Sequence, residues 1–473
     1  MTSPENTTSD DLAGLTERYA RSAGDAKRLP LGLHLASALG EKGSYLEAIR
    51  VLQEILPAAR TKEERAQVLR KRGWINLRLS QYDKAYQFLG EALELLSASN
   101  SLDLFGVYYD IAWMFYRQGY IENARNYCDG ARQVLAGLVA GDARAASQAQ
   151  LDLLHITALI EAADGNHEAA AAHLAAEIAT HRASGDQYRL AGACNKLASV
   201  TMATGDVIKA LEYQAQAHDV SQRSGEVFRL ALSHKNYGDI YYVIGDLDRS
   251  LEHYRESLRI AQEIHNRLGE VFAGAGIGKV LGCRGDCQAA ARQMESALAA
   301  ARELGNRDRE TCILVDLAEV HCLCRRAADA MSCLESADGI EAQRGQQHSP
   351  RHQLVKARAL LLRRTRVDND QAGQIAEQLL AAPIRIDDEE MVSVPELRIA
   401  ARLVRAEVLR RRGQADQAKT EAAAAAADID AFCAPLDPGQ QALFRAKPAI
   451  AEVEALRRQP AGTEPNQSTA SVP

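Results

Sequence analysis

The sequence predicts an all-α solenoid of about ten helical hairpins, on three observations. A glycine-containing turn recurs about every 40 residues, columns of small residues share that period, and only 12 prolines interrupt 473 residues. A single hairpin cannot bury its own apolar face, so neighbouring hairpins must stack. Hydrophobic residues make up 47% of the chain, which is enough for a large interior and excludes wholesale disorder.

The turn marks the middle of each repeat. Its central members stand 40 residues apart, and three of them are glycine followed by aspartate. A glycine at this point can end one helix in the left-handed conformation without steric cost. The turn positions, in order along the chain, are Gly43, Ser80, Gly119, Gly165, Gly205, Gly245, Gly285, Arg325 and Gly413.

Small and large residues alternate in fixed columns before each turn. Small side chains at fixed places allow two helices to approach closely, while larger ones fill the space between them. The small column is Ala198, Gly238, Gly278 and Ala318, and the large column is Leu197, Tyr237, Ile277 and Leu317. Each repeat is therefore expected to form two amphipathic helices around its turn.

The chain divides into seven segments in order. Residues 1–26 are expected to form a disordered N-terminus and a lead-in helix, and residues 459–473 a disordered tail. The segment 431–458 is expected to form a capping helix in which Phe444 and Ile450 cover the final repeat. The remaining segments are three repeats at 27–136, a connection at 137–150, five repeats with a 40-residue period at 151–340, and degenerate repeats at 341–430.

One repeat carries a recognisable signature. Tyr237-Gly238 and Tyr241, followed by Ser250 and Tyr254, resemble the tetratricopeptide repeat, which couples a small residue and an aromatic on one helix to the same pair on the next. The 40-residue period is similar to a longer-repeat branch of this family, which includes kinesin light chains and the repeat regions of bacterial transcriptional activators and kinases. The resemblance covers roughly residues 28–430 and implies a right-handed superhelix. It also implies that the first helix of each pair lines a concave wall where partners bind.

The resemblance also implies which side chains face the concave wall. Both tryptophans of the chain fall on neighbouring inner positions with arginines beside them, and aromatic and arginine side chains are common anchors of protein interfaces. The alternative, that both tryptophans pack between helices, stays open. Lys279 and Glu319 continue the wall. The predicted partner-binding residues are Arg70, Trp74, Arg78, Tyr109, Trp113, Tyr116, Arg117, Asn195, Lys235 and Tyr242.

Composition excludes several other classes of protein. The net charge of −7 and the pI near 6.0 oppose a nucleic-acid coat or an anionic-membrane binder. No run of 18 apolar residues occurs, and the N-terminus lacks a signal-peptide pattern, so a cytoplasmic protein without a membrane partner is expected. The nine cysteines are then expected to be reduced thiols. Nothing in the sequence indicates the oligomeric state.

Two motifs resemble chemical sites and are better explained by packing. The glycines of 274–279 lack the spacing and the Ser or Thr of a phosphate-binding loop. Six cysteines crowd 283–333, and His321-Cys322-x-Cys324 comes nearest to metal-ligand spacing, but paired knuckles are missing. The sequence contains no Gly-x-Ser-x-Gly, no His-Glu-x2-His and no kinase signature. We therefore expect no enzyme activity, no cofactor and no metal.

These features predict a non-catalytic scaffold that binds a peptide or partner protein in its concave groove. The alternative is a ligand-sensing or peptide-sensing module of a bacterial signalling or transcription-control system that acts through a partner chain. A partner captured in fixed proportion would favour the scaffold. Stabilisation by a small ligand would favour the sensor.

Overall fold

The computed structural model describes residues 9–22, 27–41, 44–79, 81–118, 120–138, 143–343, 348–381 and 393–458. Across these ranges every regular element is a helix, so the predicted all-α solenoid is confirmed. Several expectations lie outside the described residues: the first eight residues, the break at Gly141-Asp142, most of the acidic loop at 383–395, and the tail at 459–473.

Ten consecutive helix pairs follow a lead-in helix, α1 (Ser9–Arg21). A short 3-10 turn (Leu56–Ala58) follows the first pair, and two short helices, α22 (Pro438–Ala446) and α23 (Pro448–Arg458), close the described chain. The pairs are α2 (Arg28–Glu41) and α3 (Tyr45–Ile55), α4 (Lys62–Arg78) and α5 (Tyr82–Leu96), α6 (Leu102–Arg117) and α7 (Ile121–Gly137), α8 (Ala143–Ala163) and α9 (His167–Ser184), α10 (Gln187–Thr204) and α11 (Val207–Ser224), α12 (Val227–Ile244) and α13 (Leu247–Glu263), α14 (Arg267–Cys283) and α15 (Cys287–Glu303), α16 (Arg307–Leu323) and α17 (Ala327–Gln343), α18 (Pro350–Arg363) and α19 (Arg366–Ala381), and α20 (Val394–Arg411) and α21 (Ala415–Cys433).

The recurring turn ends one helix and begins the next. Gly205 and Gly245 have φ values of 88° and 90°, the left-handed conformation that glycine adopts without penalty. The aspartate that follows each of them caps the next helix, accepting a hydrogen bond from the backbone N–H three residues later. Where glycine is absent, Arg325 still adopts a φ of 57°, so the turn geometry persists through the sequence change.

The small column marks the closest approach of the two helices in a pair. A Cβ on Gly238 would lie 2.7 Å from the Tyr254 ring, and one on Gly278 would lie 2.5 Å from Met294. These glycines face the partner helix and lie inside α12 and α14, so packing explains the glycine-rich run at 274–279. Tyr254 and Met294 are themselves fully buried.

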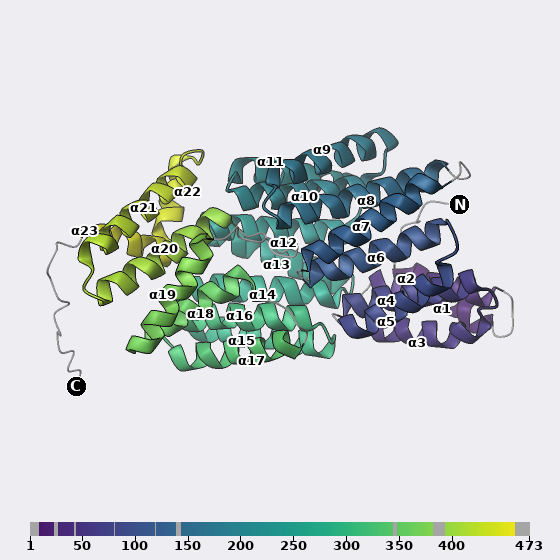
Figure 1. Cartoon of the computed structure of the whole chain (residues 1–473), viewed down its shortest axis with the longest axis horizontal. Coiled ribbons are helices and arrows are strands. Elements are labelled where there is room, and N and C mark those ends of the chain that lie inside the picture. The colour runs from purple at the N-terminus through teal and green to yellow at the C-terminus, as the bar shows by residue number, and fades with distance from the viewer. Residues whose placement is uncertain are drawn as a thin grey trace.

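The even-numbered helices form the inner wall of the solenoid. They contact one another directly from α2 to α8 and again from α10 to α20. Figure 1 shows the stacked pairs winding from the purple N-terminal hairpins through the teal middle to the green and yellow C-terminal ones. The first helix of each pair therefore lies where the family resemblance implied.

The solenoid winds far enough for distant repeats to touch. Asp308, at the start of α16, accepts hydrogen bonds from Tyr82 Oη at 2.6 Å and from Arg117 Nη2 at 2.9 Å. A Cβ on Gly205 would lie 2.8 Å from Pro395, and one on Gly245 would lie 2.7 Å from the carbonyl oxygen of Leu443. Segments about 200 residues apart thus pack against each other.

The C-terminal helices fold back onto the middle of the solenoid. Instead of one capping helix, residues 431–458 hold the end of α21 and the helices α22 and α23. Phe444 and Ile450 are buried in one cluster with Phe432 of α21 and with Val243 and Ile244 of α12. These side chains cover the last repeat, as expected, and in addition tie it to repeats far upstream.

One sequence expectation about the cysteines is wrong. Cys287 and Cys324 form a disulfide that joins the start of α15 to the residue after α16. The other seven cysteines are free thiols. The partners are 37 residues apart, and each lies beside a recurring turn, so the stacking of adjacent repeats brings them together.

Candidate binding site on the inner wall

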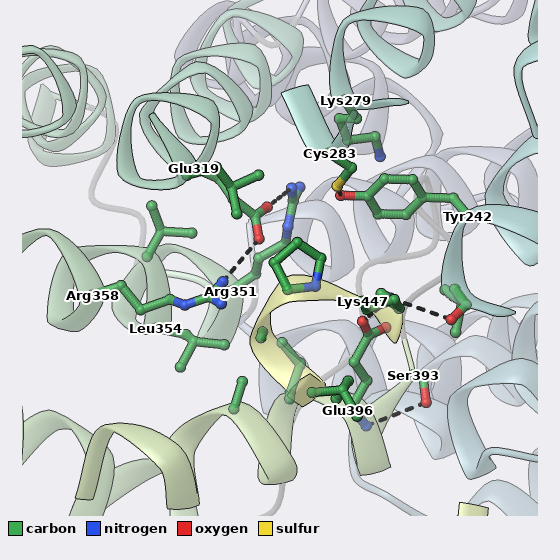
Figure 2. Close-up of a pocket in the computed structure, with 18 of the residues that line it drawn as sticks. Tyr242, Lys279, Cys283, Glu319, Arg351, Leu354, Arg358, Ser393, Glu396 and Lys447 are labelled. Atoms are coloured by element: carbon green, nitrogen blue, oxygen red, sulfur yellow. Dashed lines mark hydrogen bonds and ion pairs between the residues drawn. The ribbon is translucent and has the colours of Figure 1, made fainter. Parts of the chain in front are cut away.

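A pocket of about 110 Å³ opens where the inner wall meets the C-terminal helices. We call it the inner-wall pocket. Its residues come from α12, α14, α16 and α18 on one side, and from α20, α23 and the α22–α23 junction on the other. Figure 2 shows the α22–α23 junction crossing the pocket, with Lys447 directed toward it. Charged and tyrosine side chains that line it are Asp239, Tyr242, Lys279, Glu319, Arg351, Arg358, Glu396 and Lys447.

Glu319 is the centre of the best-defined charge cluster in the pocket. Its two carboxylate oxygens accept from Arg351 Nη2 at 2.6 Å and from Arg358 Nη1 at 3.2 Å (Figure 2). Burial by itself raises the pKa of Glu319, but the two guanidinium groups outweigh burial and hold the pKa below its usual value. Arg351 also pairs with the buried Asp316 carboxylate at 2.5 Å, so the cluster holds two guanidinium groups and two carboxylates.

Lys447 connects the C-terminal segment to the inner wall. Its ammonium donates to the carbonyl oxygen of Val243 at 3.2 Å and contacts the Glu396 carboxylate. The same ammonium lies 5.3 Å from the centre of the Tyr242 ring, within the range of a cation–π interaction. Where the segment covers the pocket, it therefore makes polar contacts that a ligand could replace.

Tyr242 and Cys283 form the apolar side of the pocket. The tyrosine hydroxyl lies 3.2 Å from Cys283 Sγ (Figure 2). Burial raises the pKa of the tyrosine well above its usual value and also raises the pKa of the Cys283 thiol. A protonated thiol is a weak nucleophile, so this arrangement suits binding through hydrogen bonds and charge better than covalent chemistry.

The structure places every predicted site residue on an even-numbered helix. Four of them meet at the α4–α6 contact: Arg70 pairs with Asp110 at 2.6 Å, and the Trp113 ring makes edge contacts with Tyr109 and Tyr116 at centroid distances of 6.5 and 5.7 Å. We call this group, with Arg117, the α4–α6 aromatic cluster. Its side chains are partly or fully buried, so much of each one packs between helices.

Trp74 lies one repeat earlier and packs differently from Trp113. Its ring contacts Gly40 of α2, where an added Cβ would lie 3.0 Å from it. The exposed Arg78 guanidinium lies 5.8 Å from the centre of the Trp74 ring. The two tryptophans therefore belong to neighbouring patches of the inner wall, one on α4 and one on α6.

The remaining predicted residues lie on α10 and α12. Asn195 accepts from Asn236 Nδ2 at 3.3 Å, and Lys235 pairs with Asp239 at 2.8 Å. Only Tyr242 among the ten predicted residues lines the inner-wall pocket.

Sequence reasoning missed the half of the pocket contributed by the C-terminal repeats. Lys279 and Glu319 were recognised because they hold the 40-residue register. Arg351 and Arg358 follow the irregular stretch after α17, where the register is lost, and Glu396 and Lys447 reach the pocket only through the fold-back of the chain. No periodic signal marks a contact between residues about 200 positions apart.

Stacked helical pairs with a pocket on their inner wall define a helical-repeat protein. A family model described as tetratricopeptide repeat matches residues 188–263 and 229–303, which include α10 to α15. This central part of the chain therefore matches the tetratricopeptide-repeat family. Among the described helices, none has both the length and the apolar character needed to cross a bilayer.

Solved structures are similar to this chain at low sequence identity. A Rap protein complexed with competence and sporulation factor is 12% identical, with a TM-score of 0.55 over 78% of this chain and 99% of that one. Aspartyl phosphate phosphatase F from Bacillus subtilis is 11% identical, with a TM-score of 0.46 over 72% and 96%. Yeast Tom70 is 12% identical, with a TM-score of 0.37 over 91% and 96%. No curated protein matches the chain.

Proposed function

We propose that this protein is a non-catalytic interaction module that binds an extended segment of a partner protein along its inner wall. One side chain or chain end of that segment enters the inner-wall pocket. A cavity of about 110 Å³ is smaller than pockets for drug-sized ligands, which hold roughly 300 Å³ or more, and suits a single residue.

The observation that carries the proposal is the charge lining of the pocket. Side chains from four successive repeats converge there with Glu396 and Lys447 of the C-terminal helices. Lys279, Arg351, Arg358 and Lys447 are opposed by Asp239, Glu319 and Glu396, so the pocket has one more cation than anion. This balance favours a carboxylate, from an acidic side chain or a C-terminus, as the entering group.

The α4–α6 aromatic cluster is the second proposed contact region. Trp113 and Tyr109 are only partly buried, and both lie on a helix of the inner wall. Aromatic rings that keep an exposed edge are frequent anchors of interfaces. A partner segment that extends from the pocket toward α6 would use both regions and add their modest contributions.

The alternative function is that of a sensor, and the cover over the pocket favours it. The α22–α23 junction closes the pocket through Lys447, so a small ligand that displaces this contact would move α22 and α23. The similar Rap chain was crystallised with a bound factor. In this version the protein is a regulatory module, here proposed for a bacterial signalling system in the cytoplasm.

The test is to isolate the partner, purify it, and measure its affinity for variants of the pocket. The double variant Lys279→Ala, Arg358→Ala should bind the partner at least about tenfold more weakly, because losing partners of buried charges costs about 2 kcal/mol or more. Lys209→Ala, Arg223→Ala is the matched control, since it removes one lysine and one arginine from α11, an odd-numbered helix. Equal losses in both variants, or no loss in the pocket variant, would refute the proposed site.

A further inference from the structure

Four side chains with metal-ligating atoms meet at the junction of α17 and α18. Asp338 and Glu341 lie on α17, His348 lies between the two helices, and His352 lies on α18. One nitrogen or oxygen atom from each lies within 4.8 Å of the corresponding atoms of the other three. We call this group the α17–α18 cluster. It shares no residue with the inner-wall pocket.

The central histidine of the cluster is fully buried and makes no hydrogen bond through its ring. His352 has 0% exposure, and its Nε2 and Nδ1 lie 2.9 Å from Asp338 Oδ1 and 3.1 Å from Glu341 Oε2. Despite these distances, both ring nitrogens of His352 and the Oδ1 atom of Asp338 lack a hydrogen-bond partner. The oxygens therefore lie away from the N–H directions that a hydrogen bond requires. Within the cluster, His348 Nδ1 and Glu341 Oε2 do form a hydrogen bond, at 2.5 Å. The ligand atoms of His352 and Asp338 that lie this close without a hydrogen bond suit a shared ion.

A neighbouring lysine orients one of the carboxylates. Lys356 Nζ donates to Asp338 Oδ2 at 2.7 Å, which leaves Oδ1 directed at the two histidines. Outer-shell contacts of this kind are typical of metal ligands, because they fix the oxygen that binds the ion. Glu341 is buried as well, and its Oε2 is hydrogen-bonded to His348 Nδ1 and lies 3.1 Å from His352 Nδ1.

We propose that the α17–α18 cluster binds a divalent transition-metal ion of the zinc class. Two imidazoles and two carboxylates form a four-ligand set of nitrogen and oxygen, which zinc accepts in tetrahedral geometry. Calcium and magnesium take oxygen ligands almost exclusively, so the histidines oppose them. With neutral histidines, the two carboxylates are opposed by Lys356 and the ion. No sequence motif marks this site, since its ligands do not follow the spacing of a zinc knuckle.

The ion would hold together a junction that the repeat pattern leaves irregular. It would join the last turn of α17 to the first turn of α18, across the step where the 40-residue register is lost. Arg351, next to His352, and Arg358 on the same helix both line the inner-wall pocket. Metal binding would therefore fix the position of the helix that supplies these two cations.

The competing arrangement is a cluster without an ion, held by Lys356 and by the His348–Glu341 hydrogen bond alone. The two arrangements differ in one measurable respect: only a metal site binds zinc through all four side chains together.

The experiment uses the purified full-length chain, stripped with a chelator and titrated with Zn²⁺ and with Co²⁺ at neutral pH. We expect one equivalent to bind, visible Co²⁺ absorption bands of a tetrahedral N/O site, and a higher melting temperature with Zn²⁺. His348→Ala and Asp338→Asn should each weaken binding by more than about tenfold. His173→Ala, on α9, is the control and should bind like the original chain.

Two controls test whether the variants still fold and whether free cysteine thiols bind the zinc instead. His348 is the most exposed ligand, with 38% of its side chain accessible, so its loss should leave the circular dichroism spectrum unchanged. Cys322→Ser, Cys333→Ser removes two free thiols that could also capture zinc, and should not change the stoichiometry. Absence of binding, sulfur-type Co²⁺ bands, or equal zinc affinity in His348→Ala and the original chain would overturn the proposal.

Discussion

His234 is held by its neighbours in the neutral form. Its Nδ1 lies 3.0 Å from His253 Nδ1, and the His218 ring lies 5.0 Å away, centre to centre. Burial, followed by repulsion from these two histidines and weaker repulsion from Arg259, lowers the pKa of His234 to about 4, although Glu256 acts in the opposite direction. Burial also lowers the pKa of His218 and of His253.

The depressed pKa predicts acid sensitivity. In the unfolded chain His234 takes up a proton near its ordinary pKa of 6.5, whereas in the folded chain its pKa is about 4. The stability that neutral His234 contributes is therefore fully present above pH 6.5 and is lost as the pH falls from 6.5 toward 4. Protonation of His234 alone should lower the free energy of unfolding by up to about 2 kcal/mol between pH 7 and pH 5. Urea unfolding of His234→Gln should show a correspondingly smaller loss over this range. An identical pH dependence in the two proteins would contradict the argument.

The role of a single residue could be predicted from the sequence where its position recurs in every repeat, but not where two residues form a contact that occurs only once. The small residues Gly238 and Gly278 could be assigned to helix contacts because they recur every 40 residues, and both face a large buried side chain. The Cys287–Cys324 disulfide could not be anticipated. Nine cysteines allow many pairings, and only the stacking of adjacent turns selects this one.

At the scale of elements, α22 and α23 are held to the solenoid mainly by apolar contacts. Phe444 has no exposed surface, and its ring centre lies 4.3 Å from that of Phe432 in α21. The same buried cluster includes Val243 and Ile244 at the end of α12. The helices that cover the inner-wall pocket are thus held by an apolar cluster that joins them to both α21 and α12.

Removal of the Phe444 ring should open this cover. Phe444→Ala is expected to cost about 3 kcal/mol of local stability, as for other buried phenylalanines. Amide hydrogen exchange in α22 and α23 should accelerate, while exchange in α14 and α16 stays unchanged. Leu443→Ala is the control, because the neighbouring side chain is 39% exposed and should change little. Uniform acceleration throughout the chain would show that α22 and α23 are not a separable cover.

Elements were predictable from the sequence to the extent that they repeat. The Gly-Asp turns located the helix pairs between 151 and 340, since glycine ends one helix and aspartate caps the next. The C-terminal helices carry no repeat, so composition indicated that they cover the last hairpin but could not indicate that they also reach α12.

At the scale of the whole molecule, the winding of the solenoid decides what the inner wall can bind. Contacts of Asp308 with Tyr82 and Arg117 join repeats about five steps apart, and the C-terminal helices close the wall over α12. A partner on the inner wall therefore meets the charged pocket at a point where the C-terminal helices cover the wall. The sequence predicted the inner wall from the repeats. It could not predict the contacts between distant repeats, because each of these contacts occurs only once in the chain.

The most direct measurement is photocrosslinking from the inner wall. A photoreactive benzoylphenylalanine would replace Leu323, an apolar residue of α16 that lines the inner-wall pocket, or, as the control, Arg223 on α11, in the cell that makes the protein. We predict that position 323 crosslinks to one short segment of one partner protein and that position 223 does not. Crosslinks to that partner from position 223 alone would contradict binding on the inner wall.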